Sequence, residues 1–281
     1  MPAWPEFDRG GVPGLRILIT SDLHFEATGP EAIRRFVAGI DREAPDLVVV
    51  GGDLGYPLHL YEQCLALFLV LDCPVAVLPG NQDIWTSPGT SSIALLEEQL
   101  PAIVRELDFH WLENDPLVLP GGIAICGSLG WYDYSARVAD DGDLQRIVAR
   151  KDGFCLDAEY IDWEYTDPQF SDICRERLLR QMRALEDNPR VSCVACVTHV
   201  PVFADQYEPN PEDERWCRSL PYLANLTLGE ALRTFPKLRY LISGHMHSGL
   251  QGVVERDGLD PIATAVVGSG YGRPRWLVLE L

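Results

Sequence analysis

Short runs of apolar residues alternate along the chain with longer stretches in which apolar residues recur every three or four positions. The runs predict buried strands, and the longer stretches predict amphipathic helices. In the first half the predicted order is strand, helix, strand, helix and strand, over residues 15–20, 31–43, 46–53, 58–71 and 74–81. This alternation is typical of a parallel sheet whose strands are joined by crossover helices.

The second half of the chain has a different pattern. Residues 117–128 predict a hairpin that turns at Gly121 and Gly122, and residues 172–185 predict a helix. Between them, residues 131–170 are acidic, aromatic and weakly periodic, which predicts a long loop or insertion. Further strands are predicted over residues 191–199, 238–245, 250–254, 262–269 and 275–281.

The number and order of these elements predict an α/β fold in which two mixed β-sheets pack as a sandwich flanked by helices, in four layers. No internal repeat, low-complexity segment or linker divides the sequence. We therefore expect residues 1–281 to form a single domain, with the loop or insertion at about 131–170.

The charge of the chain limits its partners. The sequence has 42 acidic and 23 basic residues, a formal net charge of −19, and no basic stripe. We therefore expect no nucleic-acid partner. An acidic protein that binds an anionic substrate needs local positive charge, and bound divalent metal ions can supply it.

Other features favour a cytoplasmic protein without a membrane partner. The longest apolar run, residues 64–71, is too short to cross a bilayer, and the first fourteen residues lack the pattern of a signal peptide. The eight cysteines lie mostly among aliphatic residues, as reduced core thiols do. Cys193 and Cys196 are three apart on a predicted strand and should face opposite sides, so we interpret them as core thiols, not a metal or redox pair.

Side chains that bind metal ions follow five of the predicted strands. They are Asp22, His24, Asp53, Asn81, His199, His245 and His247. In open α/β sheets, ligands bind outside the carboxyl ends of the strands. Residues two apart in an extended segment point to the same side, so Asp22 and His24 should reach one point together, as should His245 and His247.

These residue types predict the kind of metal. Imidazole combined with carboxylate favours Mn, Fe, Zn or Ni over calcium in an all-oxygen site. A carboxylate in the middle of the set, such as Asp53, can bridge two ions. Two ions roughly 3.5–4 Å apart can stabilise the attacking and leaving oxygens of an in-line displacement. We therefore expect two divalent transition-metal ions as cofactors.

The five segments "SDLH", "GGD", "GNQD", "TH" and "GHMH" resemble, in this order, the calcineurin-like metallophosphoesterases. The resemblance implies a helix-flanked β-sandwich with two metals at one edge. It implies that Asp22, His24 and His247 hold one metal and that Asn81, His199 and His245 hold the other. It further implies that Asp53 bridges the metals and that a bridging hydroxide attacks the phosphorus of a small phosphorylated substrate, a mono- or diester.

The sequence departs from the family pattern at Gln82, where the family usually has a histidine that assists the leaving group or binds a phosphoryl oxygen. A glutamine can donate a hydrogen bond but cannot protonate an alkoxide. A positioned general acid is typically worth ~10²–10⁴-fold in rate. We therefore expect an active hydrolase that Gln82 slows or restricts to fewer kinds of ester, with Asp53 and Gln82 as its catalytic residues. Asp83 should orient a neighbouring group, His199 being one candidate.

Two other functions are compatible with the same ligands. One is a metal-binding scaffold with little or no turnover, in which the histidine has been lost. The other is a metallohydrolase that cleaves an amide or a lactone. The sequence specifies neither the substrate, nor the identity of the metal, nor the oligomeric state.

Weaker signals concern substrate contacts. The glycine-rich segment 268–275 lacks the Lys and Ser/Thr of a phosphate-binding P-loop, so a turn between two strands is the favoured interpretation. Arg273 in that segment is nevertheless a candidate substrate contact. Trp131 and Tyr132 follow the predicted hairpin, and we expect them either to line a substrate pocket or to pack in the core.

Overall fold

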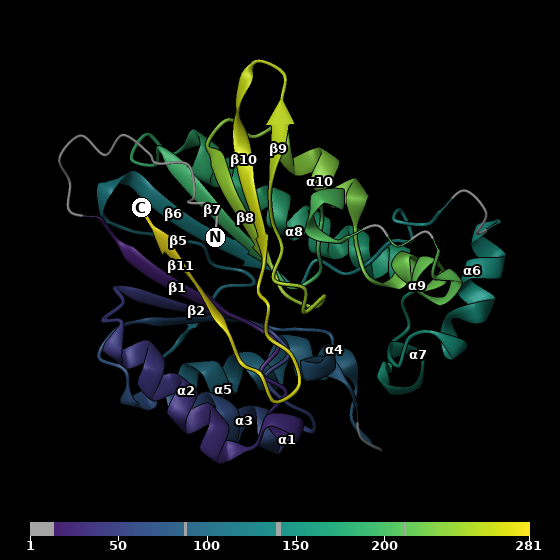
Figure 1. The fold of residues 1–281 in the computed structure, drawn as a ribbon, viewed down its shortest axis with the longest axis horizontal. Helices are drawn as coiled ribbons and strands as arrows, with labels where there is room; N and C mark the ends of the chain where they lie inside the picture. The colour runs from purple at the N-terminus through teal and green to yellow at the C-terminus, as the bar shows by residue number, and fades with distance from the viewer. Residues whose placement is uncertain (1–13, 87–88, 139–141, 209, 211) are drawn as a thin grey trace.

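Two sheets packed face to face form the centre of the protein, and helices cover their outer faces (Figure 1). The computed structural model describes residues 14–86, 89–138, 142–208, 210 and 212–281. The first sheet has the strand order β11 (Trp276–Glu280), β1 (Arg16–Thr20), β2 (Leu47–Gly51), β3 (Val75–Leu78) and β4 (His110–Trp111). Only β11 runs antiparallel to its neighbour.

The second sheet is also mixed. Its strand order is β5 (Leu117–Val118), β6 (Ile123–Ser128), β7 (Cys193–Thr198), β8 (Leu238–Ser243), β10 (Leu259–Val266) and β9 (Gln251–Arg256). The four central strands are parallel, and the edge strands β5 and β9 are antiparallel to their neighbours. The predicted sandwich of two mixed sheets is confirmed, as is the hairpin formed by β5 and β6.

The helices cover the two sheets separately. Those on the outer face of the first sheet are α1 (Phe25–Thr28), α2 (Pro30–Arg42), α3 (Leu58–Ala66), α4 (Ser92–Ala94) and α5 (Leu100–Glu106). The second sheet is covered by α8 (Asp167–Asp187) and α10 (Leu226–Leu232), while α6 (Leu144–Arg150), α7 (Asp157–Tyr160) and α9 (Glu214–Ser219) lie to one side (Figure 1). No helix within the described ranges combines the length and the apolarity needed to cross a bilayer.

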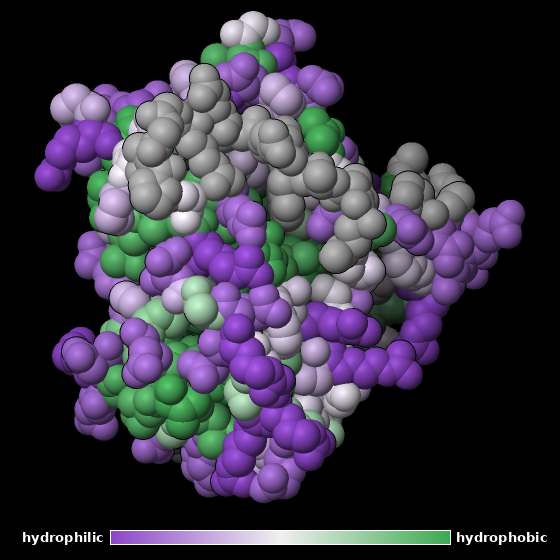
Figure 2. All heavy atoms as spheres, turned by 60° about the vertical axis from the view of Figure 1, so that its left-hand side comes forward, coloured by the Kyte–Doolittle hydropathy of each residue, from purple (hydrophilic) through white to green (hydrophobic). Residues whose placement is uncertain are grey.

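Alternating side chains of each strand build the layers. Ile17 and Ile19 of β1 belong to the core between the sheets, whereas Leu18 packs on the helices. On β7, Cys193 faces the core between the sheets and Cys196 the core under α8. The interpretation of these two cysteines as core thiols on opposite sides is therefore confirmed. Figure 2 shows hydrophilic side chains over much of one face, with apolar patches between them.

Three elements differ from the predictions. Residues 131–170 are not one loop, because they contain α6, α7 and the start of α8. Helix α8 begins five residues earlier than expected, because Thr166 and Gln169 form a reciprocal capping box at its N-terminus. The helix expected over 58–71 ends at Ala66 and continues as a 3₁₀ turn over Leu67–Val70.

A buried glutamate joins the end of β6 to the segment after β4. Glu113 is 1% exposed and accepts hydrogen bonds from the Ser128 hydroxyl and the Leu129 N–H. Burial raises the pKa of Glu113 to about 7, although those two hydrogen bonds oppose the shift. The folded protein therefore holds a proton that the unfolded chain releases near the ordinary glutamate pKa.

This difference predicts a pH-dependent stability. As pH rises from the unfolded pKa of about 4.3 to about 7, the contribution of Glu113 to the free energy of unfolding should fall, by about 3 kcal/mol. Glu113→Gln should remove that decline, so the free energy of unfolding of the variant should rise relative to that of the wild type as pH increases. Urea unfolding of both proteins at pH 5 and pH 8 measures the effect. A difference between the two proteins that does not change with pH would contradict it.

Candidate metal centre

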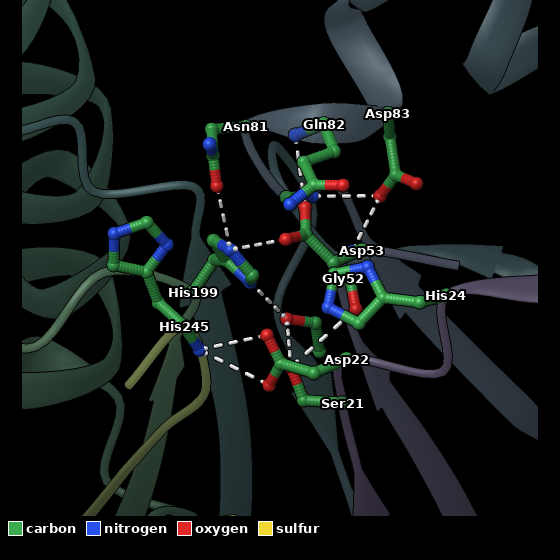
Figure 3. Close-up of polar contacts among 12 residues, drawn as sticks. Ser21, Asp22, His24, Gly52, Asp53, Asn81, Gln82, Asp83, His199 and His245 are labelled. Atoms are coloured by element: carbon green, nitrogen blue, oxygen red, sulfur yellow. Dashed lines mark hydrogen bonds and ion pairs between the residues drawn. The ribbon is translucent and has the colours of Figure 1, made fainter. Parts of the chain in front are cut away.

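The carboxyl ends of five parallel strands meet at one edge of the sandwich. β1, β2 and β3 are neighbours in the first sheet, and β7 and β8 are neighbours in the second. Each strand is followed within a few residues by one or two of the side chains that the sequence marked as metal ligands. Figure 3 shows Asp22, His24, Asp53, Asn81, His199 and His245 gathered at this edge.

Two groups of side chains have the geometry of metal sites. In the first, Asp22, His24 and His247 have ligand atoms that all lie within 4.8 Å of one another. His247 Nε2 is 3.1 Å from His24 Nε2 and 3.2 Å from Asp22 Oδ1. The prediction that Asp22 and His24 lie at the same site is confirmed. The prediction that His245 and His247 share a site is wrong, because His247 lies with Asp22 and His24, and His245 belongs to the second group.

The second group contains Asp53, His199 and His245, again with ligand atoms within 4.8 Å of one another. His199 Nε2 lies 3.5 Å from Asp53 Oδ2 and 3.1 Å from the side-chain oxygen of Asn81. The structure thus brings all seven candidate ligands together, with Asp53, which the resemblance made a bridge between the two metals, grouped with the second set.

The backbone at these residues is not extended. Asp22, His24, Asp53, His245 and His247 all have positive φ, between 42° and 65°. This left-handed conformation is uncommon for residues other than glycine and is concentrated at functional sites. The argument from an extended segment was therefore wrong, because tight turns and not strand periodicity aim these side chains.

Glycines allow the turns to approach one another. A Cβ atom at Gly80 would overlap the Asp53 carboxylate, and one at Gly52 would overlap the backbone of Gly80. Gly52 also has a φ of 94°. Gly52 and Gly80 are therefore required by the close contact between the turns after β2 and β3.

The second group is strongly coupled electrostatically. Burial by itself would lower the pKa of His199, but the Asp53 carboxylate and its hydrogen bond raise it to about 10. Burial and the neighbouring charge of His199 lower the pKa of His245 to about 4. Burial would raise the pKa of Asp53, but His199 lowers it well below the ordinary value. The cluster thus holds one proton on His199, and a cation that binds there has to displace it.

The residues present fit a pair of transition-metal ions. His245 Nε2 is buried and has no hydrogen-bond partner within the described part of the chain. Buried polar atoms are normally paired, so an unpaired imidazole nitrogen beside a carboxylate indicates a missing partner. The nitrogen and oxygen donors of both groups are those that Mn, Fe, Zn and Ni accept.

Asp83 organises the backbone and not His199. Its carboxylate accepts hydrogen bonds from the backbone N–H groups of Asp53, Leu54 and Gly80 at 2.8 Å and of Gly55 at 3.3 Å. Burial and the nearby Asp53 raise its pKa to about 7, against these N–H groups. His199 is oriented instead by its Nδ1 atom, 2.9 Å from the Gly51 carbonyl oxygen. Asp83 therefore does orient a neighbouring group, but that group is the turn after β2 and not the candidate His199.

Gln82 is half-buried and lies beside Asp53 (Figure 3), and the Tyr271 side chain that it contacts is 58% exposed, so this is the open side of the site. Its backbone N–H donates to Asp53 Oδ1 at 2.9 Å, and its side-chain amide donates to the Tyr271 hydroxyl at 3.4 Å. The Tyr271 ring is stacked on His24, with ring centroids 4.3 Å apart. Sequence reasoning missed Tyr271, whose only signal was an aromatic residue in the glycine-rich turn between β10 and β11.

The predicted substrate contacts have different outcomes. Trp131 and Tyr132 are both 0% exposed and donate hydrogen bonds to Asp167 and Asp157, so they pack in the core and do not line a pocket. Of the two alternatives for Trp131 and Tyr132, packing in the core is therefore the one that the structure shows. Arg273 is exposed in the turn that holds Tyr271, and its contact with substrate stays a prediction.

The segment over 131–170 contributes another residue that sequence reasoning missed. Asp157, at the start of α7, accepts a hydrogen bond of 2.8 Å from the side-chain nitrogen of Asn81. No motif marked it, because a lone aspartate in an acidic segment carries no pattern of its own.

The comparison with known families decides the class of the protein. The calcineurin-like phosphoesterase family matches residues 15–249, which include all seven candidate ligands. The chain belongs to this family. It combines two mixed sheets with an edge rich in Asp and His. No curated protein matches it in sequence.

Solved structures share the fold of this calcineurin-like phosphoesterase. A phosphopantetheinyl hydrolase from Mycobacterium tuberculosis is 18% identical, with a TM-score of 0.72, over 94% of this chain and 96% of that one. A dimetal phosphatase from Danio rerio is 13% identical, with a TM-score of 0.58, over 93% and 89% of the two chains. At these identities the likeness is one of fold.

Proposed function

We propose that this protein hydrolyses a small phosphate mono- or diester with two divalent transition-metal ions. The observation that carries the proposal is the convergence of seven buried or half-buried ligand side chains, in two groups, at one edge of a metallophosphoesterase fold. The family match and the dimetal phosphatase of the same fold support it.

The residues have distinct roles in this proposal. Asp22, His24 and His247 would hold one ion, Asn81, His199 and His245 the other, and Asp53 would contact both. When bound, the ions activate water as a nucleophile and polarise the phosphoryl group. Gln82 donates a hydrogen bond from its side-chain amide to a phosphoryl oxygen. Asp83 holds the turn that carries Asp53, because its carboxylate accepts hydrogen bonds from four backbone N–H groups.

The charge of the protein agrees with a metal-dependent mechanism. A net charge of −19 repels a phosphate ester, and the site itself contributes the carboxylates of Asp22 and Asp53. Two divalent cations would reverse the local charge and so allow an anionic substrate to bind. The open side of the site offers neutral donors, the amide of Gln82 and the hydroxyl of Tyr271.

The experiment that tests the proposal is metal removal and replacement. The chelated protein should lose hydrolytic activity, and it should regain activity with Mn, Fe, Zn or Ni at two ions per chain. The substrate panel should contain aryl and alkyl monoesters, diesters and nucleotides. It should also contain a phosphopantetheinyl ester, since a protein of the same fold is named a phosphopantetheinyl hydrolase.

The same panel separates the alternatives. Two bound ions with no hydrolysis of any ester or anhydride would favour a metal-binding scaffold. Turnover of amides or lactones alone would favour a different metallohydrolase chemistry. Retention of full activity after exhaustive chelation would contradict the proposal.

A further inference from the structure

Asp157 is a buried carboxylate on which four donors converge. It is 1% exposed, and one of its oxygens accepts from the side-chain nitrogen of Asn81 at 2.8 Å and from Trp85 Nε1 at 2.6 Å. The other oxygen accepts from the Tyr132 hydroxyl at 3.0 Å and from Cys155 Sγ at 3.2 Å. Only one of these four donors, Asn81, is a candidate metal ligand.

The contact decides which end of the Asn81 amide faces the metal centre. A side-chain amide has a donor end and an acceptor end of nearly equal shape, and its hydrogen bonds select between the two orientations. Each of the four contacts has an Asp157 oxygen as its acceptor, so Asp157 takes the NH₂ end of Asn81. The oxygen end is thereby turned toward the second group, 3.1 Å from His199 Nε2. A cation can bind that oxygen and cannot bind the NH₂ end.

The donors from Trp85 and Tyr132 fix the carboxylate in turn. They come from the turn after β3 and from the chain after β6, so two segments fix the position of Asp157 independently of its hydrogen bond with Asn81. Residues that orient metal ligands in this way typically change metal affinity by 10–100-fold when they are altered.

We propose that Asp157 is a positioning residue of the second ligand group, which holds the oxygen of Asn81 toward the bound ion. The inference deepens the proposed function and rests on it for the identity of the ligand. It also gives the segment over 131–170 a role in the metal centre, because that segment delivers Asp157 to a ligand 76 positions earlier in the chain.

The test compares Asp157→Asn with a matched control in the same segment. Asp167 is also a buried aspartate, 6% exposed, which accepts from Trp131 Nε1, from the Tyr134 hydroxyl and from Lys151 Nζ. None of these three donors is a candidate ligand. Asp167→Asn therefore removes a buried carboxylate of similar surroundings without touching the metal centre.

Calorimetric titration of the metal-stripped proteins with Mn²⁺ or Zn²⁺ provides a readout that does not depend on turnover. Asp157→Asn removes the charge of the acceptor and leaves one oxygen and one NH₂ group where four donors converge, so the hold on the Asn81 amide weakens and affinity for the second ion should fall about 10–100-fold while the first is retained. Asp167→Asn should bind both ions as the wild type does, whatever its melting temperature.

Milder variants keep the test decisive if either aspartate variant fails to fold. Tyr132→Phe removes one donor to Asp157, and Tyr134→Phe removes one donor to Asp167. Tyr132→Phe should show a smaller loss of affinity for the second ion, and Tyr134→Phe none.

Each outcome separates this inference from the proposed function. Unchanged affinity in both Asp157→Asn and Tyr132→Phe would overturn the inference, even if the wild type hydrolyses esters. Equal losses in the Asp167 and Asp157 variants would also overturn it, because they would show a general effect on stability. A wild type that binds two ions without any hydrolysis would contradict the proposed function, and loss of the second ion in Asp157→Asn would still support the inference.

Discussion

Asp53→Asn is expected to lower metal-dependent phosphoester hydrolysis by at least about 10³-fold, since Lewis-acid activation is worth several kcal/mol of barrier. Asp53 belongs to the second ligand group, and one of its oxygens lies 3.5 Å from His199 Nε2. The substitution replaces that anionic ligand by an amide of the same shape. It should also abolish the rise in melting temperature that metal produces in the wild type, because ligand binding stabilises the folded state.

The substitution should leave the local fold intact. Asparagine tolerates the left-handed conformation that Asp53 adopts, with φ of 54°. Its side-chain oxygen can still accept the 2.9 Å hydrogen bond from the Gln82 N–H. Activity and metal-dependent melting should both be measured, at matched metal concentrations. Wild-type turnover by Asp53→Asn with two ions bound would show that Asp53 does not hold the reactive ions.

Gln82→His is expected to raise the hydrolysis of alkyl phosphates by ~10²–10⁴-fold, the range that a positioned general acid contributes. Gln82 is on the open side of the site, and its side chain already reaches the hydroxyl of Tyr271, which is stacked on the ligand His24. An imidazole at this position could donate a proton to the departing alkoxide. Glutamine has no proton to give near neutral pH.

The dependence on leaving group is the internal control for this variant. Aryl phosphates and phosphoanhydrides leave as weakly basic anions, so the same substitution should accelerate their hydrolysis much less. The ratio of kcat/KM for alkyl and aryl esters should therefore rise in Gln82→His and stay at the wild-type value in Gln82→Asn. An equal change for every leaving group would show that position 82 affects binding and not proton transfer.

The metal ligands were predictable because the strands that carry them are strongly patterned. Continuous apolar runs such as residues 46–53 are typical of parallel strands buried on both faces, and a polar residue directly after such a run marks the edge of the sheet. The order of those residues then matched a family that covers residues 15–249. The identity of the candidate ligands therefore followed from local sequence, whereas their grouping came from the family resemblance and not from the spacing.

Other features depend on contacts that local sequence does not encode. Trp131 and Tyr132 were candidates for a substrate pocket, but both are fully buried, because the chain after β6 folds under the segment that contains α7. The start of α8 was missed for a different reason, since its capping box was present in the sequence at Thr166 and was hidden by the weak periodicity around it.

The sequence by itself determined the fold class, the family and the set of candidate metal ligands, because apolar periodicity and the residues that follow each strand are local properties. Only the tertiary structure decided how those side chains are aimed. The hydrogen bond from the His245 N–H to the Asp22 carboxylate and the hydrogen bond from Asn81 to Asp157 join segments that lie far apart in the chain. Such contacts form only when both sheets and the segment over 131–170 pack at one edge, so no stretch of sequence specifies them alone.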